Sequence, residues 1–171
     1  MKRYKILIVV ISIFIFSAII SSIFVFLYIK SLIPIYVFGE SDLFWGEPLF
    51  MARHSVPENA EKTSLKEANL IVLEYDCIVD GYPSEIALYF FGSFRRLSSF
   101  TCRISVEEQL ADSEFSVIVD RLRNKLSEHG GFYSKTDAVS STFGINYGAE
   151  GISYEVKTDG DSIFISGDYC F

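Results

Sequence analysis

The stretch NLIVLEYDCIVDGYPSEIALYFF, residues 69–91, decides the fold. Over residues 69–79 apolar side chains alternate with polar ones, which is the two-residue period of a strand that buries one face. Residues 81–84 supply turn-forming side chains, and residues 85–91 form a second run rich in apolar and aromatic side chains. The stretch therefore predicts two consecutive strands joined by a hairpin or a short connection.

The same alternation marks four further strands. They cover residues 97–105, 143–147, 152–157 and 162–166. Asp159 and Gly160 stand between the last two runs, and an Asp-Gly pair in that position is a strong hairpin signal. The sequence thus predicts three strands before residue 106 and three strands after residue 142.

One segment between these two groups of strands has a helical period instead. Apolar residues recur there at spacings of three and four, so they form one stripe along a helix. The stripe consists of Phe115, Ile118, Val119, Leu122 and Leu126. Residues 105–108 have the form of a capping box, Asp112 or Ser113 offers an alternative cap, and Gly130 with Gly131 ends the helix.

These elements predict an α+β domain over residues 68–171, built on a mainly antiparallel sheet in βββ-α-βββ order with one long helix packed on it. A sandwich-like arrangement is the alternative. Residues 30–67 are expected to form a juxtamembrane segment and linker before this domain.

The N-terminal part of the chain indicates a membrane anchor. From Ile6 to Ile29 no residue is charged, and a helix over residues 6–29 would be about 36 Å long, enough to cross a bilayer core of about 30 Å. A cleaved signal peptide is the alternative, although the run is long for one and lacks a clean cleavage site. The basic residues of the N-terminal flank predict that residues 1–5 are cytoplasmic and that the domain is extracytoplasmic, as in a bacterial inner-membrane protein with a periplasmic domain.

Charge divides the chain in the same way. The net charge is −7, but four of the fifteen basic residues lie at positions 2, 3, 5 and 30 while all 22 acidic residues come later. Residues 31–171 therefore carry a net charge of −11. Such a domain is repelled by phosphate backbones, which argues against nucleic acid as a partner and is compatible either with a basic protein partner or with plain solubility.

The three cysteines suggest one disulfide. Cys77 and Cys102 both project to the predicted core side of strands, so a Cys77–Cys102 bond is expected in an oxidising compartment. Cys170 is a competing partner, and buried free thiols are the alternative. The cysteine spacings fit neither a zinc site nor a CxxC redox motif.

No residue pattern indicates catalysis, a cofactor or a metal. His54 lies in the linker, His129 lies where it would complement the dipole at a helix C-terminus, and Glu107 with Glu108 suits the first turn of a helix. No Gly-x-Ser-x-Gly elbow is present. The chain is therefore expected not to be an enzyme.

Aromatic residues provide the best candidates for a protein interface. Several exceed what a small core accommodates, and exposed aromatic clusters mark partner surfaces. The candidates are Tyr82, Tyr89, Phe91, Phe94 and Tyr133. Phe44, Trp45 and Phe50 are expected at the membrane headgroups or, alternatively, in contact with a second membrane protein. Arg95, Arg96 and Arg103 form either a small basic patch or scattered ion pairs.

The sequence is compatible with three functional hypotheses. The first is a membrane-anchored extracytoplasmic binding module that engages a protein partner, for example a periplasmic immunity-type inhibitor of a toxin. The second is a structural subunit of a membrane or envelope assembly, such as a secretion or division complex. The third is a hydrolase with an unrecognised site.

Overall fold

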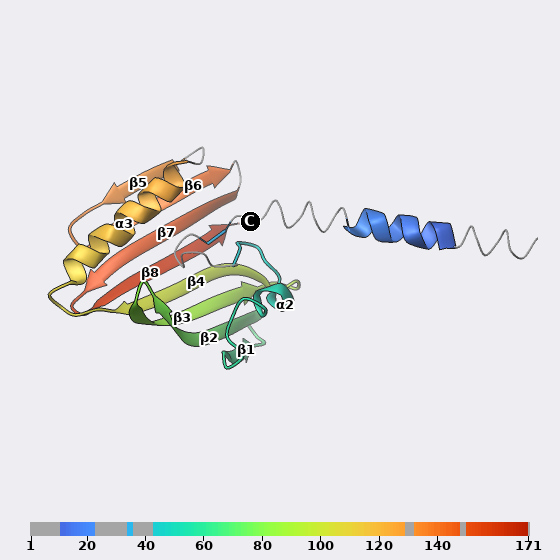
Figure 1. The fold of residues 1–171 in the computed structure, drawn as a ribbon, viewed down its shortest axis with the longest axis horizontal. Coiled ribbons are helices and arrows are strands. Elements are labelled where there is room, and N and C mark those ends of the chain that lie inside the picture. The colour runs from blue at the N-terminus through green and yellow to red at the C-terminus, as the bar shows by residue number, and fades with distance from the viewer. Residues whose placement is uncertain (1–10, 23–33, 36–42, 129–131, 148–149, 171) are drawn as a thin grey trace, which may run out of the picture. The chain divides into compact units, whose positions relative to one another are not determined.

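The computed structural model describes residues 11–22, 34–35, 43–128, 132–147 and 150–170. The chain divides into two compact units, Met1–Ile33 and Pro34–Phe171. The second unit holds all the strands of the structure (Figure 1).

An antiparallel sheet of eight strands forms the frame of the second unit. A short helix, α2 (Leu49–Ala52), precedes the sheet, and a long helix, α3 (Ala111–Ser127), divides the strands into two groups of four. The strands are β1 (Glu61–Leu65), β2 (Leu70–Val79), β3 (Tyr82–Phe91), β4 (Arg96–Ser105), β5 (Phe132–Thr136), β6 (Ser140–Tyr147), β7 (Glu150–Asp159) and β8 (Ser162–Cys170). Their order across the sheet is β1-β2-β3-β4-β8-β7-β6-β5, so two meanders join where β4 pairs with β8.

The predicted βββ-α-βββ order is therefore wrong, and so is the sandwich alternative. The prediction missed β1 and β5, the two edge strands, and assigned their residues to the linker and to the helix-to-strand connection. All five residues of β1 are exposed, as are four of the five in β5. Alternation of polar and apolar residues arises from burying one face, so exposed edge strands carry little of that signal.

The first hairpin is tighter than predicted. Val79 pairs with Tyr82, which leaves only Asp80 and Gly81 in the turn. Both have positive φ, 54° and 90°, as a two-residue hairpin turn of the primed type requires. The predicted hairpin between β7 and β8 is confirmed, with Asp159 paired to Ser162.

One face of the sheet, called here the covered face, packs against α3. The predicted apolar stripe of α3 is confirmed as buried, and the helix contacts β5, β6, β7 and β8. Under it lie side chains that are at most 2% exposed, which are Phe143, Ile145, Ile152 and Val156. Complete burial of a large apolar side chain contributes roughly 1.5–3 kcal/mol, so this stripe is a main source of stability.

The start of α3 differs from the prediction. Ser105 ends β4, so residues 105–108 do not form a capping box. Leu110 occupies the N-cap position, and no side-chain hydrogen bond caps the helix there. The expected end at Gly130 and Gly131, and the candidate His129, lie outside the described residues.

The covered face around Leu97, Phe100 and Tyr154 is shielded by residues 43–52, called here the strap. Its backbone joins the start of β4, because Gly46 N–H donates to the Leu97 carbonyl and Leu97 N–H donates to the Glu47 carbonyl, both at 2.9 Å. Trp45 is 1% exposed and donates its indole N–H to the Tyr154 hydroxyl at 2.9 Å. The prediction that places Trp45 at membrane headgroups is therefore wrong, since its ring belongs to the core.

The predicted transmembrane helix is not supported. In the part of the chain that the structure describes, no helix is long and apolar enough to cross a membrane. The helical residues in this region are 11–22, about 18 Å at 1.5 Å per residue, and residues 6–10 and 23–29 lie outside the described residues. The predictions of a single-pass anchor, a cytoplasmic N-terminus and a periplasmic domain are corrected accordingly.

The predicted disulfide is also wrong, because all three cysteines are free. Cys77 lies on β2 and Cys102 on β4, with β3 between them. Two strand spacings separate their backbones by roughly 9–10 Å, whereas a disulfide needs Cα atoms less than about 7 Å apart. The shared face of the two cysteines and the strand between them were both predicted, but the distance that this strand imposes on the pair was not considered.

Candidate functional site

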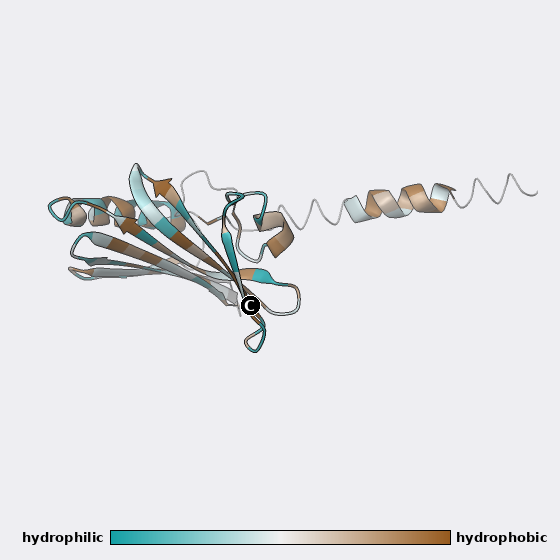
Figure 2. Cartoon of the chain, turned by 90° about the horizontal axis from the view of Figure 1, so that it is seen from below, coloured by the Kyte–Doolittle hydropathy of each residue, from teal (hydrophilic) through white to brown (hydrophobic). Residues whose placement is uncertain are grey.

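The second face of the sheet, called here the open face, carries neither α3 nor the strap. Figure 2 shows the helix on one side of the strands only. The register brings open-face side chains into rows that cross the strands. One row is Val72, Tyr89, Ser99 and Asp168; the next is Glu74, Ala87, Thr101 and Ser166; the third is Asp76, Glu85, Arg103 and Phe164.

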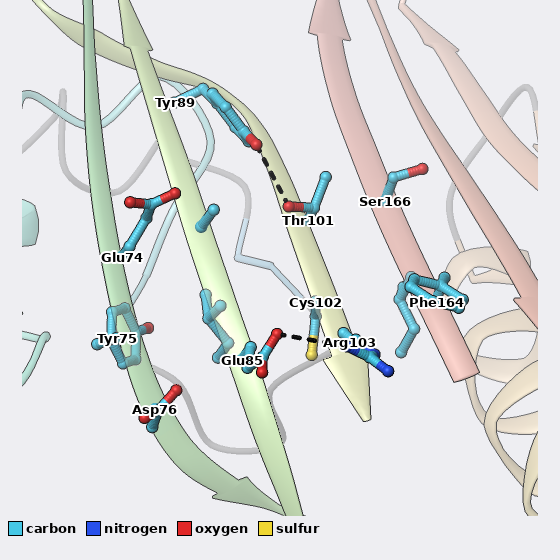
Figure 3. Close-up of a pocket in the computed structure, with 13 residues that line it drawn as sticks. Glu74, Tyr75, Asp76, Glu85, Tyr89, Thr101, Cys102, Arg103, Phe164 and Ser166 are labelled. Carbon is cyan, nitrogen blue, oxygen red and sulfur yellow. Dashed lines mark hydrogen bonds and ion pairs between the residues drawn. The ribbon is translucent and has the colours of Figure 1, made fainter. Parts of the chain in front are cut away.

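A hollow of about 550 Å³ occupies the open face over β2, β3, β4 and β8. The middle row explains it, because Ala87, Thr101 and Ser166 are small while the flanking rows contain Tyr89 on one side and Phe164 on the other (Figure 3). The volume falls within the roughly 300–1,000 Å³ typical of ligand pockets. The same hollow is open enough to admit a side chain from a second protein.

Acidic side chains dominate the β2 end of the hollow. Glu74, Asp76 and Glu85 line it, with Arg103 as the basic residue among its lining. Asp76 lies directly opposite Glu85 in the register, and Glu74 lies opposite Glu61 of the edge strand β1. Like charges directly opposite each other destabilise a strand pair. The sheet therefore carries an electrostatic cost at this site, which a cationic partner group would relieve.

Arg103 compensates only part of this charge. Its guanidinium is 3.9 Å from Glu85, and the two side chains are 47% and 70% exposed, so the ion pair is weak. The same group donates to the Ser162 hydroxyl at 3.3 Å and lies 5.7 Å from the centre of the Phe164 ring. Arg103 is thus held at the Phe164 side of the hollow.

Apolar side chains surround the hollow on the open face. Ile78, Phe91 and Phe164 are 67%, 42% and 40% exposed. The Tyr89 hydroxyl lies 3.5 Å from the Thr101 hydroxyl, a contact that holds the tyrosine ring along the wall of the hollow (Figure 3). Exposed aromatic and aliphatic side chains beside charged ones are the composition expected of a protein-binding surface.

The predicted interface residues fall into three places. Tyr89 and Phe91 lie on the open face, and Phe94, 79% exposed, lies in the turn that follows β3. Tyr133 shares the open face but belongs to β5, five strands from β3, or roughly 24 Å away. Tyr82 belongs to the covered face, where partial burial and then Glu114 raise its pKa. Only Tyr89, Phe91 and Phe94 therefore belong to one surface.

The three arginines considered as a basic patch do not cluster. Arg95 lies in the turn before β4, and its φ is 48°. Arg96 begins β4 and Arg103 lies seven residues further on, roughly 23 Å along the strand. Arg96 stacks on Phe94 at 5.8 Å, so both strand arginines contact an aromatic ring.

Burial favours the neutral forms of the titratable groups on the covered face. Burial raises the pKa of Cys102 to about 12 and, with the neighbouring thiols, also raises the pKa of Tyr75. A thiol held neutral is a poor nucleophile. His54 is exposed, and among the described residues no group of three or more His, Cys, Asp or Glu side chains is placed to hold a metal ion.

Comparison with known proteins assigns no family. No protein-family model matches the chain, and neither a curated protein nor a solved structure is significantly similar to it. The geometry of the open face is therefore the basis for assigning a function.

Proposed function

We propose that the second unit is a protein-binding module and that the open face over β2, β3 and β4 is its binding surface. The observation that carries this proposal is the hollow lined by Glu74, Asp76 and Glu85 and bordered by exposed aromatic residues. A partner that presents a basic group within an apolar surface would satisfy both components. The net charge of −11 over residues 31–171 would also speed its association with such a partner.

An immunity-type inhibitor is the specific form that this charge favours. Inhibition would then result from covering a basic active-site surface of a toxin, since complementary charge accelerates the encounter and buried aromatic contacts slow dissociation. No catalytic group of this chain is required for that role.

Affinity capture with the full chain tests the proposal when it is combined with surface variants. The Tyr89→Ser/Phe91→Ser variant alters the open face, and Phe50→Ser/Val117→Ser is a matched control with side chains 70% and 51% exposed outside it. A single stoichiometric partner should be retained by the control and lost with the open-face variant. Equal capture by both variants would refute the open face as the binding surface.

The identity of the captured partner then distinguishes an inhibitor of a toxin from a structural subunit of an assembly. A toxin or hydrolase should lose activity when the chain is added, and Tyr89→Ser/Phe91→Ser should abolish that inhibition. Recovery of several stoichiometric components instead would favour the structural-subunit hypothesis.

A further inference from the structure

We infer that the hollow on the open face receives an arginine side chain of the partner. This inference rests on the proposed function and deepens it, because it names the chemical group that occupies the site. The occupant must be cationic and planar, and it must be able to contact carboxylates and an aromatic ring at the same time.

The negative charge of the hollow favours a cation as its occupant. Three carboxylates from β2 and β3 line the hollow, and two strand pairs oppose acid to acid, at Glu61 with Glu74 and at Asp76 with Glu85. A cation placed between β2 and β3 reduces the repulsion in both pairs, so its binding is favoured beyond its own ion pairs.

Shape favours a guanidinium over an ammonium. The small side chains of Ala87 and Thr101 leave space along the wall that the Tyr89 ring forms. A planar guanidinium can stack on that ring and still direct its N–H groups toward Glu74, which lies one row away, in paired hydrogen bonds. The chain already shows this type of contact, since Arg103 lies on Phe164 of the open face and Arg96 lies on Phe94 of the turn before β4.

The other cation in the hollow does not compete for this position. Arg103 is held toward Ser162 and Phe164, on the β8 side. Glu74 and Asp76 belong to β2, three strands from β8 in the sheet order. The proposed position is therefore the β2 side of the hollow, between Glu74 and Tyr89.

Titration of the full chain with a tetra-arginine peptide tests the inference by backbone amide chemical shifts. A tetracitrulline peptide is the matched control, since citrulline keeps the shape of arginine but has no charge. We expect tetra-arginine to shift amides of β2, β3 and β4 around the hollow, tetralysine to bind several-fold more weakly, and tetracitrulline to have no effect. Equal effects of tetra-arginine and tetracitrulline would overturn the inference.

Paired variants give a second, independent readout. Glu74→Gln/Asp76→Asn should weaken tetra-arginine binding at least about five-fold, whereas Glu58→Gln/Glu128→Gln removes the same charge from exposed positions elsewhere and should change it by less than about two-fold. Equal weakening by both would show general attraction to an acidic protein and would overturn the site. If the captured partner is lost with Tyr89→Ser/Phe91→Ser but binds Glu74→Gln/Asp76→Asn normally, the proposed function holds and the arginine site is refuted.

Discussion

The covered and open faces of the sheet are formed by the same strands but differ in what their side chains contact. On β3, Ile86, Leu88 and Phe90 are at most 3% exposed, while Ala87 and Tyr89 between them belong to the open face. The covered face holds the fold together. The open face keeps acidic and aromatic groups that we expect to contribute less to stability, as the proposed role in recognition requires.

Substitution of Trp45, which anchors the strap to the covered face, should cause the largest loss of stability. Trp45 packs on Phe100, Tyr154 and Tyr169, with ring centres 5.6–6.2 Å apart. Trp45→Ala should lower the free energy of unfolding by about 3–5 kcal/mol, measured by urea denaturation. Trp45→Phe keeps an aromatic ring and loses the hydrogen bond, so it should cost less. A loss below about 1 kcal/mol for Trp45→Ala would show that the strap is not part of the core.

Thiol labelling compares the two faces directly. Cys102 is 1% exposed on the covered face, and Cys170 is exposed at the end of β8. An alkylating reagent at about pH 8 should modify Cys170 about a hundredfold faster than Cys102, because Cys102 reacts only after opening of the structure. Comparable rates in folded protein would contradict the assigned faces.

Burial of the Cys102 thiol predicts that the stability of the fold decreases at high pH. The pKa of Cys102 is about 12 in the folded chain, while an unfolded cysteine titrates near about 8.5. The stabilising contribution of the buried, neutral Cys102 thiol is therefore complete below about pH 8.5. It is lost as the pH rises toward about 12. Unfolding free energy of the wild type should fall more steeply over this range than that of Cys102→Ala, as urea denaturation at a series of pH values would show. Parallel pH profiles for the two proteins would contradict the burial of this thiol.

Two glycines offer a matched steric comparison. A Cβ at Gly167 would meet the rings of Phe100 and Trp45 in the core, whereas a Cβ at Gly144 would meet the ring of Tyr133. Tyr133 is 44% exposed and can move into solvent. Gly167→Ala should therefore destabilise by about 1–3 kcal/mol and Gly144→Ala by less than about 1 kcal/mol. Equal losses in thermal or urea unfolding would refute the difference in packing between the faces.

The smallest effect on stability is expected from the open face itself. Tyr89→Ser/Phe91→Ser removes one half-buried and one exposed aromatic ring without opening a core cavity, so the free energy of unfolding should change by about 1 kcal/mol or less. Urea denaturation of this variant beside Trp45→Ala measures the contrast. A loss as large as that of Trp45→Ala would mean that the open face is covered in the folded chain.

Alternation alone predicted the faces of the long strands. It placed Cys77 and Cys102 on the core side and Glu74 with Asp76 opposite, and the stripe of α3 was equally visible. It missed the exposed edge strands, because a strand without a buried face has no such pattern. The Asp80-Gly81 turn was readable from the same dipeptide signal that identified the β7–β8 hairpin.

The candidate site was only partly predictable. Tyr89 and Phe91 were selected as exposed aromatics, but the hollow depends on which residues lie beside Ala87 on neighbouring strands. That register joins β4 to β8 although α3, β5, β6 and β7 lie between them in the sequence, and no local pattern specifies such a pairing. Trp45 was misplaced for a related reason, because its partners Phe100 and Tyr154 are distant in sequence.

Site-specific photo-cross-linking of the full chain in its own cells tests the central claim most directly. A photoreactive phenylalanine would replace Phe91 or Phe164 on the open face, and Phe50 or Val117 outside it; all four positions are exposed. We predict one shared adduct from Phe91 and Phe164 and none from Phe50 or Val117. An adduct that forms only from Phe50 or Val117 would contradict the assignment of the open face as the binding surface.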